Sequence, residues 1–146
     1  MSLAEEVLAY LRNHQVMTLA TAGDDGPWAA AVFYANDGYD LYFLSAPTTR
    51  HSRHIATDPR AAAAIHEDYS DWRAIQGIQL EGPVTMLTAA EADAARTIYA
   101  EKYPFIVAAD ATIQRALQKV AWYRLRPAHL FFVDNQRGFG RREQLF

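Results

Sequence analysis

A basic segment, Thr48-Thr49-Arg50-His51-Ser52-Arg53-His54, carries the residues of this sequence that are best suited to bind a ligand. Residues 49–57 are expected to form a short helix, so two arginines and two histidines crowd its N-terminal end. That end carries the positive pole of the helix dipole, where cations are unfavourable. A phosphate would reverse this penalty, because it accepts hydrogen bonds from helix N–H groups, threonine hydroxyls and arginine. The segment therefore predicts an anion site.

A simpler interpretation is that these side chains extend into solvent or pair with Asp58, Glu67 or Asp68, the commoner outcome for an isolated cluster. The preceding sequence favours a ligand instead. The segment follows an apolar strand that ends in Leu44-Ser45, and an apolar wall beside a phosphate site suits an aromatic nucleotide cofactor.

Small and aromatic residues elsewhere are compatible with a flat ring and equally with ordinary packing. The run Ala29-Ala30-Ala31 would let a ring approach the backbone, or let two sheet layers pack closely. Trp28, Trp72 and Trp122 could wall a ring system, although large aromatic residues are more often core or interface anchors.

Other chemistries find little support in the sequence. The absence of cysteine excludes thiolate nucleophiles, disulfides, iron–sulfur clusters and cysteine zinc sites, so redox chemistry would require an organic cofactor or haem. His51 and His54 could share a helix face as metal ligands, with His66 and Glu67 as further candidates, but a clear third ligand is missing and we expect no metal. There is no phosphate-binding glycine loop or serine nucleophile motif, and no catalytic residue can be named.

Length and composition indicate one globular domain spanning residues 1–146. The formal net charge of −3 provides no overall attraction for nucleic acid or anionic lipid. No signal peptide is recognisable, and no segment approaches the roughly 20 apolar residues of a membrane span. We therefore expect a cytoplasmic protein that binds neither nucleic acid nor membranes.

Hydrophobic periodicity, caps and turn residues predict a mainly β protein with flanking helices. Helices are expected at residues 3–13, 49–57, 88–103 and 110–120, and strands at 16–21, 28–34, 40–45, 60–66, 75–87, 122–125 and 129–134. The first three strands are expected to form an antiparallel meander, and Arg141-Arg142 a solvated tail. A sheet of six or seven antiparallel strands needs closure to hide its edges, so we expect a closed or split β-barrel.

Four sequence stretches resemble the pyridoxamine 5′-phosphate oxidase-like superfamily of flavin-binding split barrels, and the resemblance extends over nearly the whole chain. They are Val16–Ala22 with Gly26-Pro27 and the strand to Phe33, Leu41–Ser45, Thr49-Arg50-His51 through Ile55 to Asp58-Pro59-Arg60, and Gln76–Gly82.

This resemblance implies a flavin mononucleotide (FMN) site. Thr49, Arg50 and His51 match the family's serine or threonine and two basic residues that hold the FMN phosphate, with histidine where lysine is usual. Leu44 and Ser45 match the pair at a strand end beside the ribityl chain.

The flavin ring is implied to lie on a second strand and on a partner subunit. The residues that match the strand beside the isoalloxazine ring are Ala30, Ala31, Val32 and Phe33. A glutamine of the partner approaches the flavin in the family; alignment on Gly82 places Gly77 there, so Gln76 or Gln79 would substitute, and Gln79 is favoured.

The resemblance further implies a homodimer with FMN in the subunit cleft and an oxidoreductase acting on an unidentified small molecule or electron donor. Residues 134–142 do not match the substrate-binding motif of true pyridoxamine phosphate oxidases. Two alternatives stay open: a non-catalytic module that binds flavin, deazaflavin or haem, and a dimeric structural protein with a vestigial pocket.

Overall fold

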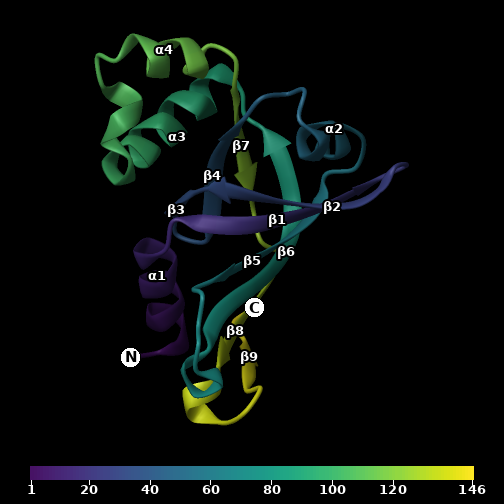
Figure 1. Cartoon of the computed structure of the whole chain (residues 1–146), viewed down its shortest axis with the longest axis vertical. Coiled ribbons are helices and arrows are strands. Elements are labelled where there is room, and N and C mark those ends of the chain that lie inside the picture. Colours follow the sequence, from purple (N-terminus) through teal and green to yellow (C-terminus); the bar gives the residue numbers. More distant parts are fainter.

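A computed structural model describes all residues, 1–146, as a strongly curved antiparallel sheet with helices at its ends and along one side (Figure 1). The helices are α1 (Leu3–Asn13), α2 (Arg50–Thr57), α3 (Ala89–Lys102) and α4 (Ala111–Leu117). The strands are β1 (Val16–Gly23), β2 (Gly26–Phe33), β3 (Ala35–Asp37), β4 (Asp40–Ser45), β5 (Arg60–His66), β6 (Gln76–Met86), β7 (Ala121–Leu125), β8 (His129–Asp134) and β9 (Arg142–Gln144). Short 3₁₀ turns lie at Trp72–Ala74, Pro104–Val107 and Asn135–Arg137.

The sheet follows the order β2-β1-β5-β6-β7-β4-β3, and β8 and β9 branch from it beside β6. The long strand β6 changes partner along its length: its first half pairs with β8, and residues 84–86 pair with β7. This change of partner bends the sheet into two halves. The predicted antiparallel split barrel with flanking helices is confirmed, with seven strands along its main path.

The expected strand pairing is wrong at β2, and the tail, although Arg141 and Arg142 are exposed as expected, is part of the sheet. β2 does not continue the meander to β4; it is an edge strand that pairs with β1, and the short β3 pairs with β4 instead. The chain leaves the sheet at Tyr34, whose side chain is fully buried and whose hydroxyl donates to the Leu11 carbonyl at 2.8 Å. The tail is also ordered: Arg142 begins β9, and its guanidinium lies 4.7 Å from the centre of the Phe131 ring.

The inner face of the barrel holds the main hydrophobic core. Met17, Leu19, Phe43 and Leu80 alternate with exposed or half-buried residues along their strands, and α1 closes the core with its apolar face. Each buried aliphatic side chain contributes about 1.5–3 kcal/mol relative to exposure. This packing is what holds β4 and α2 in place.

A second layer is formed by α3, which covers the outer side of β3 and β4, and by α4, which packs against the turn at Pro104–Val107. Ala35, Tyr99, Tyr103 and Ile106 form its buried centre, and Leu44 packs against it. The outer side of β1, β2, β5, β6 and β8 has no such cover. We call this surface the open face; its exposed or half-exposed side chains include Thr18, Ala20, Ala31, Ala62, Ala64 and Gln79.

Lys102, the last residue of α3, joins α3 to the C-terminal end of α1. Its Nζ donates to the carbonyls of Leu11 and His14 and lies 4.4 Å from the centre of the Tyr34 ring. Burial lowers the pKa of Lys102 from 10.5 to about 8, because the charged form loses solvation.

The free energy of unfolding should therefore rise with pH above about 8, because the unfolded chain keeps Lys102 protonated while the folded chain releases that proton. Urea unfolding of the wild type and of Lys102→Met, measured below about pH 10 where exposed tyrosines ionise, checks this. The wild type should gain stability with pH relative to the variant. If the free energy of unfolding depends on pH in the same way in the wild type and in Lys102→Met, Lys102 stays charged in the folded protein.

Candidate functional site

The basic segment begins α2, and Thr49 sets where the helix starts. Thr49 is the N-cap, and its Oγ1 accepts a hydrogen bond from the Ser52 N–H at 3.2 Å. The helix ends before Pro59, as predicted, and its first turn contains no acidic residue. The N–H groups of Arg50 and His51 lie in this first turn, where an α-helix offers no internal acceptor.

Behind this turn, a buried cluster of hydroxyls surrounds the His51 imidazole. Its Nε2 lies 2.6 Å from Ser45 Oγ and 3.2 Å from Thr49 Oγ1, and Ser52 Oγ donates to Ser45 Oγ at 3.2 Å. Burial, and secondarily the nearby charge of His54, lower the pKa of His51. His51 is therefore a neutral hydrogen-bonding group at neutral pH, in the position where the resemblance implies a cation.

Asp25, at the tip of the β1–β2 hairpin, holds both Arg50 and His54. The Arg50 Nε lies 3.2 Å from Asp25 Oδ2, and its Nη2 donates to the Asp25 carbonyl at 2.7 Å. The Arg50 guanidinium also lies 4.4 Å from the centre of the Trp28 ring. His54 Nε2 lies 2.6 Å from Asp25 Oδ1. We call Asp25, Arg50 and His54 the Asp25 clamp.

The hairpin is shaped to admit the His54 ring. His54 is 4% exposed, and its Nδ1 lies 2.9 Å from Thr21 Oγ1. A Cβ at Gly23 would lie 2.5 Å from the His54 ring, so glycine is required at this close approach. A hydrogen bond from His54 lowers the pKa of Asp25, with Arg50 adding to the effect, so Asp25 is ionised at neutral pH.

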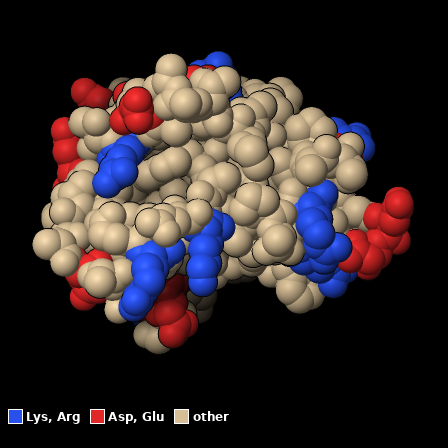
Figure 2. Space-filling view, turned by 90° about the horizontal axis from the view of Figure 1, so that it is seen from above, with Lys and Arg blue, Asp and Glu red and all other residues tan.

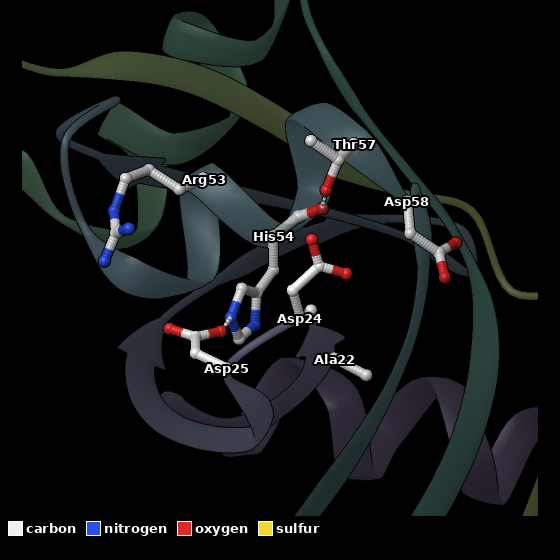
Figure 3. Close-up of a pocket in the computed structure, with 8 residues that line it drawn as sticks. Ala22, Asp24, Asp25, Arg53, His54, Thr57 and Asp58 are labelled. Atoms are coloured by element: carbon white, nitrogen blue, oxygen red, sulfur yellow. Dashed lines mark hydrogen bonds and ion pairs between the residues drawn. The ribbon is translucent and has the colours of Figure 1, made fainter.

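A hollow of about 630 Å³ opens between the hairpin and α2 (Figure 3). Figure 3 shows His54 in contact with Asp25, with Asp24 and Asp58 beside the same hollow. Three carboxylates line it against one arginine and one histidine, so the carboxylates outnumber the basic groups and disfavour a phosphate there. The start of α2 is the better anion site.

The structure brings some of the predicted site residues together and separates others. Ser45, Thr49 and His51 are joined by hydrogen bonds, whereas the Arg50 guanidinium turns to the hairpin. Leu44 faces the other side of β4, against the α3 layer.

The strand predicted to lie beside the flavin ring is the edge strand β2. Ala30 and Val32 face inward opposite Leu19 and Met17, while Ala31 and Phe33 lie on the open face. Because β2 pairs only with β1, its second edge has unpaired backbone groups that a ligand could meet.

Gln79 lies on the open face of β6, as its alternation with Ile78 and Leu80 predicted. Its Oε1 accepts a hydrogen bond from Arg142 Nη1 at 3.4 Å. No hydrogen bond joins Gln79 to α2 of the same chain, so a role at the flavin would require a second copy.

Asp25 is the functional candidate that the sequence reasoning missed. Asp58, Glu67 and Asp68 were the acidic partners considered for the basic segment, but Arg50 and His54 pair with Asp25. The only local signal was the position of Asp24-Asp25 in a hairpin turn, and a turn does not reveal which distant helix it meets.

None of the helices is long and apolar enough to cross a membrane. Seen from above, charged side chains are scattered over a mostly uncharged surface (Figure 2). The β1–β2 hairpin points to the right in Figure 1. At the right of Figure 2, basic and acidic side chains lie next to one another.

Comparison with known proteins agrees with the fold. A UPF0306 protein of Enterobacter sp. (strain 638) is 28% identical over 135 residues, which are 91% of this chain and 89% of that protein. The structure of a haem-binding protein from Mycobacterium smegmatis is 28% identical with a TM-score of 0.78; the match covers 99% of this chain, which spans 57% of that one. HutZ, the haem storage protein of Vibrio cholerae, is 18% identical with a TM-score of 0.73, over 89% of this chain and 94% of that one.

A protein-family model described as pyridoxamine 5′-phosphate oxidase matches residues 3–134, which is nearly the whole chain. The match includes the β1–β2 hairpin, the end of β4, the start of α2 and all of β6. The chain belongs to the pyridoxamine 5′-phosphate oxidase family.

Proposed function

We propose that this chain binds FMN as a homodimer and uses it as an oxidoreductase on a small molecule. The phosphate would lie at the start of α2, the ribityl chain beside the end of β4, and the ring along the edge of β2. Membership of the family supports the cofactor class. The observation that carries the proposal is the first turn of α2, which combines free N–H groups, the Thr49 cap and Arg50 with no acidic residue.

FMN would supply the hydride or electron transfer, and the chain's residues would bind and orient it. Thr49, Ser45 and Ser52 form a hydroxyl cluster that fixes the first turn of α2 in one geometry. Arg50 is the nearest cation, but Asp25 already neutralises it. A phosphate at α2 would thus share Arg50 with Asp25. FMN would therefore bind more weakly than it would to an arginine without an acidic partner.

A homodimer would cover the open face and complete the cofactor site. Thr18 lies between Ala31 and Ala64, and Ala20 lies between Ala29 and Ala62, so the centre of this face is flat and lined by small side chains. Val16 and Phe33 continue it with exposed apolar surface. A contiguous apolar face on a folded chain is typical of an interaction surface.

Ala62→Arg should break this dimer, because it places a charge at the centre of the open face without touching the core. Sedimentation analysis of the wild type should give a dimer, and the variant a monomer with reduced FMN affinity. Ala94→Arg, on the exposed surface of α3, is the matched control and should remain dimeric. A wild type that sediments as a monomer with FMN bound would exclude the shared site.

The visible spectrum tests the oxidoreductase proposal. Protein reconstituted with FMN and separated from free flavin should be yellow, and anaerobic addition of a nicotinamide donor or a small chemical reductant should bleach it. Reoxidation by an added acceptor should restore the colour. Retention of FMN without reduction by any donor would limit the protein to cofactor binding, and a colourless protein that takes up no FMN would contradict the proposal.

Haem is the second candidate ligand. The relative from Mycobacterium smegmatis is described as haem-binding at 28% identity over nearly all of this chain. The observation that favours haem in this molecule is the exposed His66 imidazole on the open face, which lies beside an apolar notch of about 170 Å³. Titration with ferric haem, followed by its Soret band, tests this candidate.

A further inference from the structure

A hollow of about 250 Å³ lies between α1 and the neighbouring ends of β6 and β8. Its α1 wall includes Glu6, Tyr10, Asn13 and His14, which share one face of the helix because they follow the spacing i, i+4, i+7 and i+8. The ring of Phe132 lines the hollow and lies 5.7 Å from the ring of Tyr10. The hollow is therefore on the α1 side of the sheet, and a dimer formed through the open face would leave it accessible.

Hydrogen bonds hold the walls of this hollow in place. The Tyr10 hydroxyl donates to the Gln76 carbonyl at 3.0 Å and lies 3.1 Å from the Tyr69 hydroxyl. Tyr69 in turn donates to Glu67 Oε2 at 2.9 Å. His14 Nδ1 lies 2.8 Å from the Tyr10 carbonyl, and its Nε2 lies 3.5 Å from Glu67 Oε2. The loop after β5 is thus tied to α1, and the hollow is preformed.

Glu6 contributes a carboxylate that is only half used. Arg137 pairs with its Oε1, whereas its Oε2 is buried and has no hydrogen-bond partner. No other buried side-chain oxygen of the chain lacks a partner. Buried acceptors are almost always hydrogen-bonded in folded proteins, so this oxygen calls for a donor.

The other unused polar groups around the hollow include further acceptors. Both contacts of the Glu67 carboxylate are made by Oε2, which leaves Oε1 available. The hydrogen bond from Tyr69, with His14 adding to the effect, lowers the pKa of Glu67, so this carboxylate is ionised at neutral pH. The side-chain amides of Asn13 and Gln76 also line the hollow and form no hydrogen bond within the chain.

The charges beside the hollow sum to a negative value. Two arginines, Arg137 and Arg141, pair with three carboxylates, those of Glu6, Asp134 and Glu143. The remaining ion pair joins a fourth carboxylate to an imidazole. A bound anion would therefore be repelled and a bound cation attracted. No group of three histidine or acidic side chains lies close enough to hold a metal ion, so the geometry favours an organic cation.

We infer that this hollow binds a small primary amine, with the ammonium group at the Glu6 carboxylate and a short apolar body against Phe132 and Ala9. An ammonium group has three donors and no acceptor, which matches a lining with several unused acceptors. The volume corresponds to roughly eight water molecules, so it admits a short alkyl or single-ring amine. The site is separate from the proposed flavin site, and neither requires the other.

The test is a calorimetric titration with benzylamine at neutral pH, with benzyl alcohol as the uncharged analogue of the same size. The wild type should bind one benzylamine per chain saturably, and benzyl alcohol at least about tenfold more weakly. Glu6→Gln keeps the size of the side chain but removes its charge, and it should weaken benzylamine binding about tenfold or more. Glu101→Gln, on the exposed surface of α3, is the matched control and should bind as the wild type does.

A second variant tests the position of the site without changing its charge. Ala9 lines the hollow, so Ala9→Phe should fill it and abolish binding of both probes. FMN affinity and circular dichroism should be unchanged in Glu6→Gln and Ala9→Phe, which shows that the fold is intact.

Three results would overturn the inference. The first is a wild type that shows no saturable benzylamine binding. The second is equal affinity for benzylamine and benzyl alcohol, which would show that the hollow does not select a cation. The third is benzylamine affinity in Glu6→Gln or Ala9→Phe equal to that of the wild type, which would place the bound amine elsewhere on the molecule.

Discussion

Gly82→Ala is expected to lower the free energy of unfolding by about 3 kcal/mol or more. Gly82 lies in β6, and the connection from β7 to β8 passes directly over it. A Cβ at this position would lie 2.1 Å from the Arg126 carbonyl oxygen and 2.9 Å from the Ala128 nitrogen. Both are backbone atoms, and Ala128 N also donates to the Glu81 carbonyl at 2.7 Å, so neither can move without breaking the strand connection.

Urea unfolding measures this effect, with Glu81→Ala as the matched control. Glu81 is the preceding residue on β6, and its side chain is exposed on the open face. Its replacement should change the free energy of unfolding by less than about 0.5 kcal/mol. Equal unfolding midpoints for Gly82→Ala and Glu81→Ala would show that the connection from β7 to β8 does not pack tightly against Gly82.

Arg50→Ala is expected to weaken FMN binding by about 1.5–3 kcal/mol, the usual contribution of a hydrogen bond to a charged group. This corresponds to roughly a 10- to 150-fold increase in Kd. Riboflavin lacks the phosphate, so its affinity should not change in the variant. Quenching of flavin fluorescence measures both ligands under the same conditions. Equal losses of affinity for FMN and riboflavin would show that Arg50 does not bind the phosphate.

Asp25→Asn extends the same experiment to the clamp. Removal of this carboxylate frees Arg50 and removes a negative charge close to the phosphate, so FMN should bind more tightly while riboflavin is unaffected. Asp24→Asn is the matched control, because Asp24 lies in the same hairpin turn and forms no ion pair. Weaker FMN binding in Asp25→Asn would instead show that Asp25 positions Arg50 for the phosphate.

Elements with local signals were predictable from the sequence. Ser2 and Glu5 form the capping box that begins α1, and Thr88 and Glu91 form the one that begins α3, both as expected. The start of α2 at Thr49 was also predictable. Each signal involves residues within about one helical turn, so the physical interaction that sets the boundary is contained in a few letters of sequence.

Pairings between distant segments were not predictable in the same way. β2 looked like the middle of a meander, but the burial of Tyr34 under α1 diverts the chain and leaves β2 at an edge. Arg141 and Arg142 are exposed, as expected, but the sequence did not predict that Arg142 begins a strand that pairs with β8. In both cases the decisive contact joins residues far apart in the chain.

The candidate site shows the same division. The sequence identified Ser45, Thr49 and His51, which the structure joins by hydrogen bonds at the end of β4 and the start of α2. It did not identify Asp25 as the partner of Arg50, because that contact depends on how the β1–β2 hairpin folds against α2. The basic residues at the start of α2 predicted a nearby anion, and the Asp25 carboxylate of the β1–β2 hairpin is one such anion.

The affinity of FMN relative to riboflavin tests the central claim most directly. Ligand-free wild-type protein is titrated with each flavin in turn, and binding is followed by quenching of flavin fluorescence. A phosphate held at the first turn of α2 predicts saturable binding of one FMN per chain, at least about tenfold tighter than riboflavin. Equal affinities for the two flavins, or no saturable binding of FMN, would contradict a flavin phosphate at α2.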